Sequence, residues 1–234
     1  NTGVGLSYQW QKDGTDISNA TNDSYTASVG GDYTVVVTNV SNCSATSSAV
    51  TLIVHDNPSA TITAQSAVEF CDGGSVVLSA NTGVDLSYQW QKGGSNLSGE
   101  TNDSYTASVG GDYTVVVTNA SNCSTTSSGT TVTVNANPSA IITAQSAVEF
   151  CDGGSVVLSA NTGVGLSYQW QKDGTDISNA TNGNYTASVG GDYTLAVTNV
   201  SNCSATSSAV TLIVHDNPSA SITPESATTF CDGG

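Results

Sequence analysis

The chain has 234 residues, with 19 acidic side chains, three lysines and no arginine, so its formal net charge is −16 at pH 7. Nucleic acids and anionic membrane surfaces are bound through clustered Lys and Arg, and this composition excludes both as partners. No apolar run approaches the roughly 20 residues of a membrane helix, so we expect no direct membrane insertion by this segment.

The sequence repeats itself at a constant spacing without insertion or deletion, because the same motif starts at Asn1, Asn81 and Asn161. Residues 1–56 differ from 161–216 at 4 positions and from 81–136 at 15 positions, so two repeat types alternate. Such an array, in which whole units are copied, is typical of chains selected for reach and stiffness.

Strand signals follow one another through each repeat as short β-branched or aromatic runs between Gly, Asn, Asp and Ser. In the repeat 57–136 they predict strand A at about 60–70, broken near Ser66, B at 75–80 and C at 86–92. A weak C′/D strand through Leu97 follows, then E near 103–108, F at 112–119 and G at about 126–134. No segment has a helical period. We therefore predict an all-β fold of tandem sandwiches with about seven strands each.

The domain boundaries are predicted at the Asn-Pro pairs that begin at Asn57, Asn137 and Asn217, because proline ends a strand and stiffens a junction. Residues 57–136 and 137–216 are then complete domains. Residues 1–56 form a partial domain with strands C to G, and residues 217–234 form a partial domain with strand A and the A–B turn.

Alternation along the strands assigns one face to the core. On strand C it places Tyr88 and Trp90 on the same side, and on strand F it places Tyr113 with Val115 and Val117. The predicted core residues in the three repeats are Trp10, Trp90, Trp170, Tyr33, Tyr113 and Tyr193. A core of this size stabilises so short a domain only marginally, and additional cross-links are expected.

The six cysteines occur two per repeat, and none has the close Cys-x-x-Cys spacing of a zinc or redox motif. Regular cysteines in a chain rich in Ser, Thr, Asn and Gly indicate an oxidising environment. We therefore expect an extracellular or cell-surface location.

Four segments of the complete repeat carry a family resemblance: 70–78 (FCDGGSVVL), 88–92 (YQWQK), 110–119 (GGDYTVVVTN) and 122–124 (NCS). Together they resemble the immunoglobulin-like tandem repeats of long bacterial surface adhesins and extracellular fibre proteins, notably those of Bacteroidota. The resemblance implies an immunoglobulin-like β-sandwich, with Trp90 as the buried tryptophan of strand C and Tyr113 as the tyrosine-corner residue. The disulfide between strands B and F is absent, because Ala80 and Val115 occupy its two positions.

The strand directions implied by this resemblance place the two cysteines of a repeat at opposite ends of the sandwich. Strands B and F run the same way, Cys71 precedes B, and Cys123 follows F. A strand of six to eight residues spans roughly 20–27 Å, whereas a disulfide needs Cα atoms within about 7 Å. We predict a Cys71–Cys203 disulfide between consecutive repeats. An intradomain Cys71–Cys123 pair and a lateral cross-link between chains remain open alternatives.

The other cysteines are expected to pair in the same register with repeats beyond this segment; they are Cys43, Cys123, Cys151 and Cys231.

No arrangement of catalytic residues recurs in the repeats, and we expect no enzyme activity. His55 and His215 are interpreted as solvated strand-end residues, because the middle repeat has Asn135 at that position. The carboxylate pairs Asp13/Asp16 and Asp173/Asp176 lie in turns, where Asp is common. Lys12, Lys92 and Lys172 precede these turns and are interpreted as solvated rather than as isopeptide donors.

No cofactor or defined metal site is predicted. Asp56 and Asp216 lie at junctions, where calcium often stiffens extracellular arrays, but Ala136 replaces them at the junction between. We expect weak surface binding of Ca²⁺ at most. Asn-x-Ser triplets, such as those at Asn39 and Asn199, are expected by chance in a chain of this composition.

The function predicted from the sequence is that of a structural extracellular array forming a stiff rod, filament or adhesin stalk. Its partners would be copies of itself along or across a fibre. The alternative is a module that binds a surface glycan or a protein receptor as part of a secreted protein.

Peptide mapping without reduction tests the predicted disulfide. We expect a peptide in which Cys71 is joined to Cys203, because these cysteines lie at facing ends of consecutive repeats. Recovery of Cys71 joined to Cys123 would contradict the prediction.

Overall fold

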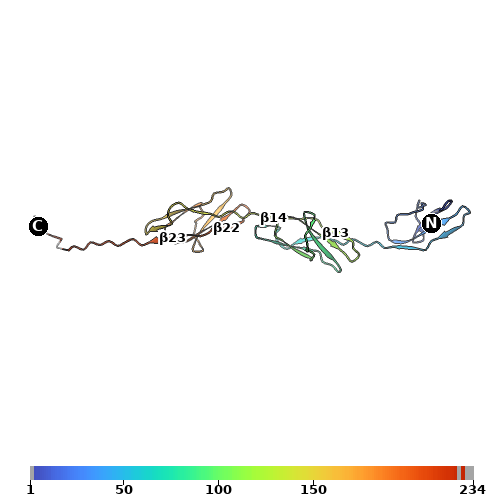
Figure 1. Ribbon diagram of the computed structural model, residues 1–234, viewed down its shortest axis with the longest axis horizontal. Coiled ribbons are helices and arrows are strands. Elements are labelled where there is room, and N and C mark those ends of the chain that lie inside the picture. The colour runs from blue at the N-terminus through green and yellow to red at the C-terminus, as the bar shows by residue number, and fades with distance from the viewer. Residues whose placement is uncertain (1–2, 226–227, 230–234) are drawn as a thin grey trace. The chain divides into compact units, whose positions relative to one another are not determined.

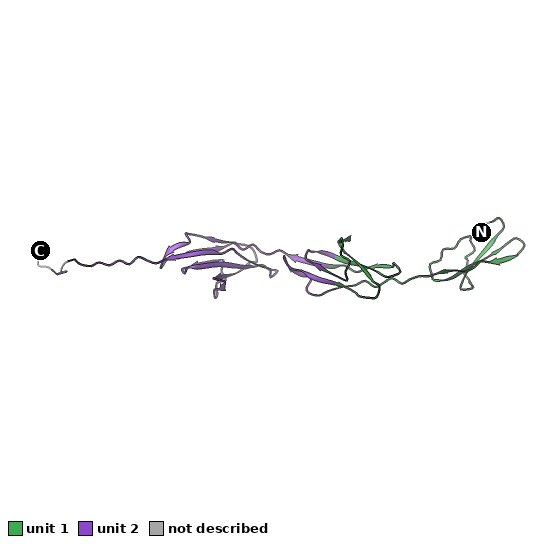
Figure 2. Cartoon of the chain, turned by 60° about the horizontal axis from the view of Figure 1, so that its bottom comes forward, with its two compact units in different colours: residues 1–63, 79–105, 113–130 green, residues 64–78, 106–112, 131–234 purple. Residues whose placement is uncertain are grey.

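The computed structural model describes residues 3–225 and 228–229, and all of its regular secondary structure is β-strand (Figure 1). The described residues contain no helix long and apolar enough to cross a membrane. The chain divides into two compact units, residues 1–63, 79–105 and 113–130, and residues 64–78, 106–112 and 131–234 (Figure 2). Since the third repeat lies wholly within the second unit, it serves as the reference for the sandwich.

The third repeat is an immunoglobulin-like sandwich of two sheets. One has the order β15-β17-β20, and the other has the order β16-β23-β21-β18-β19, with β22 also paired to β21. The strands are β15 (Ile142–Ala144), β16 (Glu149–Cys151), β17 (Val156–Ala160), β18 (Ser167–Lys172), β19 (Thr175–Asp176), β20 (Asn184–Ala187), β21 (Gly191–Thr198), β22 (Ser204–Thr206) and β23 (Val210–His215). The predicted break in strand A allows it to serve both sheets, since β15 is antiparallel to β17 and β16 is parallel to β23.

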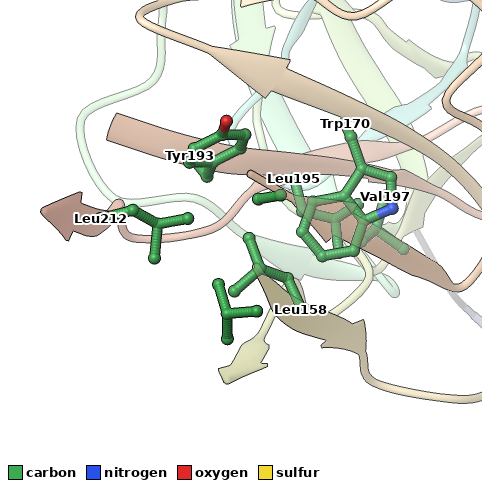
Figure 3. Close-up of a cluster of buried hydrophobic side chains, with 8 residues drawn as sticks. Leu158, Trp170, Tyr193, Leu195, Val197 and Leu212 are labelled. Carbon is green, nitrogen blue, oxygen red and sulfur yellow. The ribbon is translucent and has the colours of Figure 1, made fainter. Parts of the chain in front are cut away.

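Aromatic and aliphatic side chains from both sheets meet in one core (Figure 3). Trp170 of β18 is fully buried, Tyr193 of β21 is 1% exposed, and Leu158 of β17 packs in the same cluster. Their polar groups are satisfied: the Trp170 indole N–H donates to the carbonyl of Asn182 at 2.9 Å, and the Tyr193 hydroxyl donates to that of Val189 at 2.9 Å. Both aromatic residues therefore contribute apolar area without an unpaired buried polar group.

The middle repeat forms strands in the same chain order. They are β6 (Ile62–Ala64), β7 (Glu69–Cys71), β8 (Val76–Ala80), β9 (Ser87–Lys92), β10 (Ser95–Asn96), β11 (Ser104–Ala107), β12 (Gly111–Thr118), β13 (Ser124–Thr126) and β14 (Thr130–Asn135). Trp90 is 0% exposed and Tyr113 is 1% exposed. The predicted strand G is divided into β13 and β14 because Ser127 turns its hydroxyl inward, where it accepts from the Val115 amide at 3.1 Å.

The first repeat forms β1 (Ser7–Lys12), β2 (Thr15–Asp16), β3 (Gly31–Thr38), β4 (Ser44–Thr46) and β5 (Val50–Leu52). The strand E expected within 1–56 is wrong, because residues 24–27 form no strand. In the third repeat, strand E (β20) pairs with β17, and the counterpart of β17 would precede Asn1. Tyr33 is still 7% exposed, but Trp10 is only half-buried and Tyr25 is 37% exposed.

The strand A expected within 217–234 is also not formed among the described residues of that segment, 217–225 and 228–229. In the third repeat, strand A (β15) is held by hydrogen bonds to β17, and the described residues form no such pairing with this segment. Cys231 lies outside the described residues.

One turn is built differently in the two repeat types. A Cβ added at Gly5 would lie 2.7 Å from Cγ1 of Val40, and one added at Gly165 would lie 2.5 Å from Cγ1 of Val200. The middle repeat has Asp85 at this position, with a φ of 56°, and it has Ala120 in place of the valine. The smaller alanine side chain makes room for the aspartate.

Completing the first repeat should complete its core. With a copy of residues 137–160 placed before Asn1, we expect residues 24–27 to become a strand and Trp10 to become buried. Each newly buried Val or Leu of strand B would contribute about 1.5–3 kcal/mol. Tryptophan emission should shift to the blue, and the amides of 24–27 should gain protection from hydrogen exchange. A copy carrying Leu158→Asp is the control, and equal spectra for both extended chains would contradict the prediction.

Candidate functional site: a disulfide junction between consecutive repeats

A disulfide joins Cys71 of the middle repeat to Cys203 of the third repeat, with 5.5 Å between the Cα atoms and a sequence separation of 132 residues. Cys71 is the last residue of β7, and Cys203 lies in the turn between β21 and β22. The Cys203 side chain is fully buried, whereas Cys71 is half-buried. This bond therefore links the end of one sandwich to the turn of the next.

The intradomain alternative fails in the third repeat for a reason of strand polarity. Cys151 ends β16, where it pairs with His215 of β23, and the neighbouring Leu212 pairs with Gly191 at the start of β21. Cys203 follows the opposite end of β21. The eight residues of β21 span roughly 27 Å, far beyond the reach of a disulfide. Cys151 is free and exposed.

The short linker between the two repeats holds the strand that carries Cys71. Strand β7 runs parallel to β14, with Cys71 opposite Asn135. The pairing continues past the strand, because the Asp72 amide donates to the Asn135 carbonyl at 2.8 Å. The side-chain amide of Asn137 then donates to the Asp72 carbonyl at 3.0 Å. Cys71 is thereby fixed to the chain as it leaves the middle repeat.

The same linker also holds the turn that carries Cys203, through the side chain of Asn199. Its Oδ1 accepts hydrogen bonds from the amides of Ser201 and Cys203, both at 3.0 Å. Its Nδ2 donates to the carbonyl of Ala136 at 2.9 Å. One asparagine side chain therefore shapes the turn around Cys203 and docks that turn on the linker.

Two adjacent residues thus hold the two cysteine-bearing elements: Asn135, the last residue of β14, on the side of Cys71, and Ala136, the first linker residue, on the side of Cys203. Docking of the junction brings the two sulfur atoms close together, so most of the entropic cost of closing the loop is met before the disulfide forms. The linker therefore positions the two cysteines for the disulfide.

The same docking contacts occur at the junction between the first and the middle repeat. The side-chain amide of Asn119 donates to the carbonyl of Asp56 at 2.9 Å, and its Oδ1 accepts from the amides of Ser121 and Cys123 at 3.0 Å. Cys123 is free, and its thiol lies 3.7 Å from the carbonyl of His55.

The same turn also forms in the first repeat. In the first repeat, Oδ1 of Asn39 accepts from the amides of Ser41 and Cys43 at 3.0 Å, and Cys43 is free and exposed. The asparagine turn therefore recurs before each of these three cysteines.

A groove of about 550 Å³ lies beside the disulfide and is lined by Ala67, Glu69, Phe70, Cys71, Asn135, Val200, Ser201 and Asn202. Its residues come from the end of the middle repeat and from the cysteine-bearing turn of the third. An aromatic ring with neighbouring amide and carboxylate groups is a surface that suits a polar ligand with an apolar face.

The remaining candidates from the sequence are turn and surface groups. Lys172 pairs with Asp173, whose Oδ1 accepts from the amide of Asp192, and these hydrogen bonds, first that from Lys172, lower the pKa of the Asp173 carboxyl. His215 Nε2 lies 3.3 Å from a carboxylate oxygen of Glu149 in an exposed pair. Within the described part of the chain, no group of three or more His, Cys, Asp or Glu is placed to hold a metal ion.

No family model and no curated protein matches the sequence. Solved structures of tandem domains are similar to it in chain path. The match to extracellular domains 3–5 of Drosophila OTK has 19% identity and a TM-score of 0.37, and it covers 90% of this chain and 85% of the OTK chain. The match to the I-band fragment I67–I69 of titin has 15% identity and a TM-score of 0.45, and it covers 91% of this chain and 89% of the titin chain. The match to murine CEACAM1b has 15% identity and a TM-score of 0.34, and it covers 67% of this chain and 100% of the CEACAM1b chain.

Sequence reasoning missed the asparagines that build the junction. Asn39 and Asn199 belong to the Asn-x-Ser triplets that are expected by chance, and Asn119 is not singled out, although each of the three stands four residues before a cysteine. That fixed spacing, together with a following Asn of positive φ (58° at Asn202), is the signal of a cysteine-bearing turn.

Replacing Asn199 with aspartate should weaken closure of the disulfide without removing the turn. The carboxylate still accepts from the amides of Ser201 and Cys203, but it cannot donate to the carbonyl of Ala136. A lost hydrogen bond of about 1 kcal/mol corresponds to a roughly fivefold lower effective concentration of the two thiols, measured by equilibration with glutathione.

Asn39→Asp is the matched control, because Asn39 shapes the same turn in the first repeat. Hydrogen exchange at Ser41 and Cys43 then reports whether the turn tolerates the change. An unaltered thiol equilibrium in Asn199→Asp would show that the docking contact does not position the cysteines.

Proposed function

We propose that this chain is part of an extracellular structural array in which disulfides staple consecutive immunoglobulin-like repeats into a stiff rod, filament or adhesin stalk. The observation that carries the proposal is the bond between Cys71 and Cys203, which joins neighbouring repeats instead of closing one sandwich. A tandem arrangement of such domains supports a structural or adhesive role, and the disulfide adds a reason for stiffness.

Stiffness follows from the number of restraints on a short linker. Residues 135–137 carry backbone hydrogen bonds to the Cys71 strand and a side-chain hydrogen bond from Asn199, and the Cys71–Cys203 disulfide joins the elements on both sides. A hinge needs a few residues whose φ and ψ are free to change, and these contacts restrain the linker from both sides. The stapled junction should therefore bend less than one held by hydrogen bonds alone.

The proposal extends the same register along the protein. Cys43, Cys123, Cys151 and Cys231 would each pair with a cysteine 132 residues away in a neighbouring repeat, as Cys71 does with Cys203. Disulfides persist in oxidising surroundings, which supports an extracellular location. The bacterial cell surface is the setting that the motif resemblance suggests, and further copies of the repeat are the proposed partners.

A second candidate function is supported by the groove beside the disulfide. Phe70, Glu69 and Asn135 would present a ring face and polar groups to a surface glycan or a protein receptor. A glycan array tests this candidate with the intact chain and with Phe70→Ala, because loss of the ring should abolish any signal that depends on the groove. Equal signals from both proteins would exclude the groove as the binding surface.

Residual dipolar couplings test the proposed stiffness. In the oxidised chain, residues 57–136 and 137–216 should share one alignment tensor, because the staple fixes their orientation. The double variant Cys71→Ser/Cys203→Ser should give two different tensors. The junction at residues 55–57, which has no disulfide, is an internal reference for a docked but unstapled linker. Equal tensors in the oxidised chain and the double variant would contradict a stiffening role.

A further inference from the structure

The disulfide changes the covalent route along the chain. Cys71 and Cys203 are separated by 132 residues in sequence, so their bond closes residues 72–202 into a loop. A force applied at the two flanks of the chain passes from one sulfur atom to the other and bypasses the loop. The loop contains every strand from β8 to β21, which is most of two sandwiches.

We propose that the staple makes the array an inextensible tether, whose length under load hardly depends on whether its sandwiches stay folded. This inference rests on the proposed function and adds a mechanical property to it. In an ordinary tandem array, each domain that unfolds adds its whole chain length to the fibre. Here the bypassed residues can unfold without lengthening the route that carries the force.

Within the middle and third repeats, only the strands outside the loop carry the load directly. On one side, the load enters through β6, which is paired with β8, and through β7, which is paired with three residues of β14. On the other side, it leaves through β22, which is paired with β21, and through β23, which is paired with β21 and β16. The partner strands β8, β14, β16 and β21 all lie within the bypassed loop. Separation of these pairs therefore releases only the residues outside the loop, and the sulfur–sulfur bond then holds the tension.

If the other cysteines pair at the same spacing of 132 residues, the whole array resists extension in the same way. In the same register the next staple would start at Cys231, so the shortest covalent route from one staple to the next would run only from Cys203 to Cys231. At about 3.3–3.6 Å per residue, this segment is about 100 Å long when extended, compared with roughly 550 Å for two whole repeats without staples. A second covalent route would run in parallel with the first. It would follow the chain from Cys123 to Cys151 and then cross to the next repeat through the disulfide of Cys151.

Single-molecule force spectroscopy on the whole chain, held by terminal peptide tags, tests the inference. The unfolded oxidised chain should be shorter than the unfolded reduced chain by the length of the bypassed loop, about 430–470 Å. The double variant Cys71→Ser/Cys203→Ser should have the long contour in both conditions. Cys151→Ser, which removes a free thiol, should behave like the unaltered oxidised chain.

Peptide mapping of the same oxidised sample separates the two proposals. If the Cys71–Cys203 peptide is absent, both the proposed function and the inference fail. If the peptide is present and the chain still extends to its full contour, the bond does not survive load, and the inference alone fails.

A longer chain tests the array directly. A copy of residues 57–216 inserted after residue 216 adds two repeats. We expect mapping to show staples in the same register, and the unfolded contour to grow by about 100 Å. Growth by roughly 550 Å, the extended length of both added repeats, would overturn the extension to the array.

Discussion

Strand polarity is the constraint on which the junction depends. Because β16 runs parallel to β23 and β23 runs antiparallel to β21, the residue that ends β16 and the turn that follows β21 lie at opposite ends of one sheet. A cysteine at each of these places has no partner in its own sandwich. The same two places face each other across the short linker between consecutive repeats, and there the bond forms.

The junction combines hydrogen bonds of backbone and amide groups with a disulfide. Asn39, Asn119 and Asn199 shape the same turn in the three repeats, and Asn119 and Asn199 also dock it on a linker. This docking matters for an array of near-identical units. With a cysteine at both ends of every repeat, many incorrect pairings are chemically equivalent, and docking of adjacent repeats selects the correct one by proximity.

The sequence predicted the parts that rest on local pattern and strand direction. Alternation was enough to place Trp90 and Trp170 in the interior, and the implied strand directions favoured the Cys71–Cys203 pair between repeats while an intradomain pair stayed open. It failed where a strand depends on a distant partner: residues 24–27 have the same kind of sequence as β20 but no strand B to pair with. It also missed Asn199, because an exposed asparagine in a chain rich in asparagine has no distinctive pattern until its hydrogen bonds are seen.

The paired substitutions at Gly165/Val200 and Asp85/Ala120 bear on how such a gene can grow. The two positions of each pair are well separated in sequence, and Asp with Val would place a side chain within about 2.5 Å of Cγ1 of that valine. Unequal recombination between the two repeat types at a point between these positions would combine Asp with Val, which gives this clash, or Gly with Ala, which leaves a gap. Exchanges outside the interval keep each pair intact. A unit copied as one block would keep both compatible pairs and the constant spacing of the cysteines.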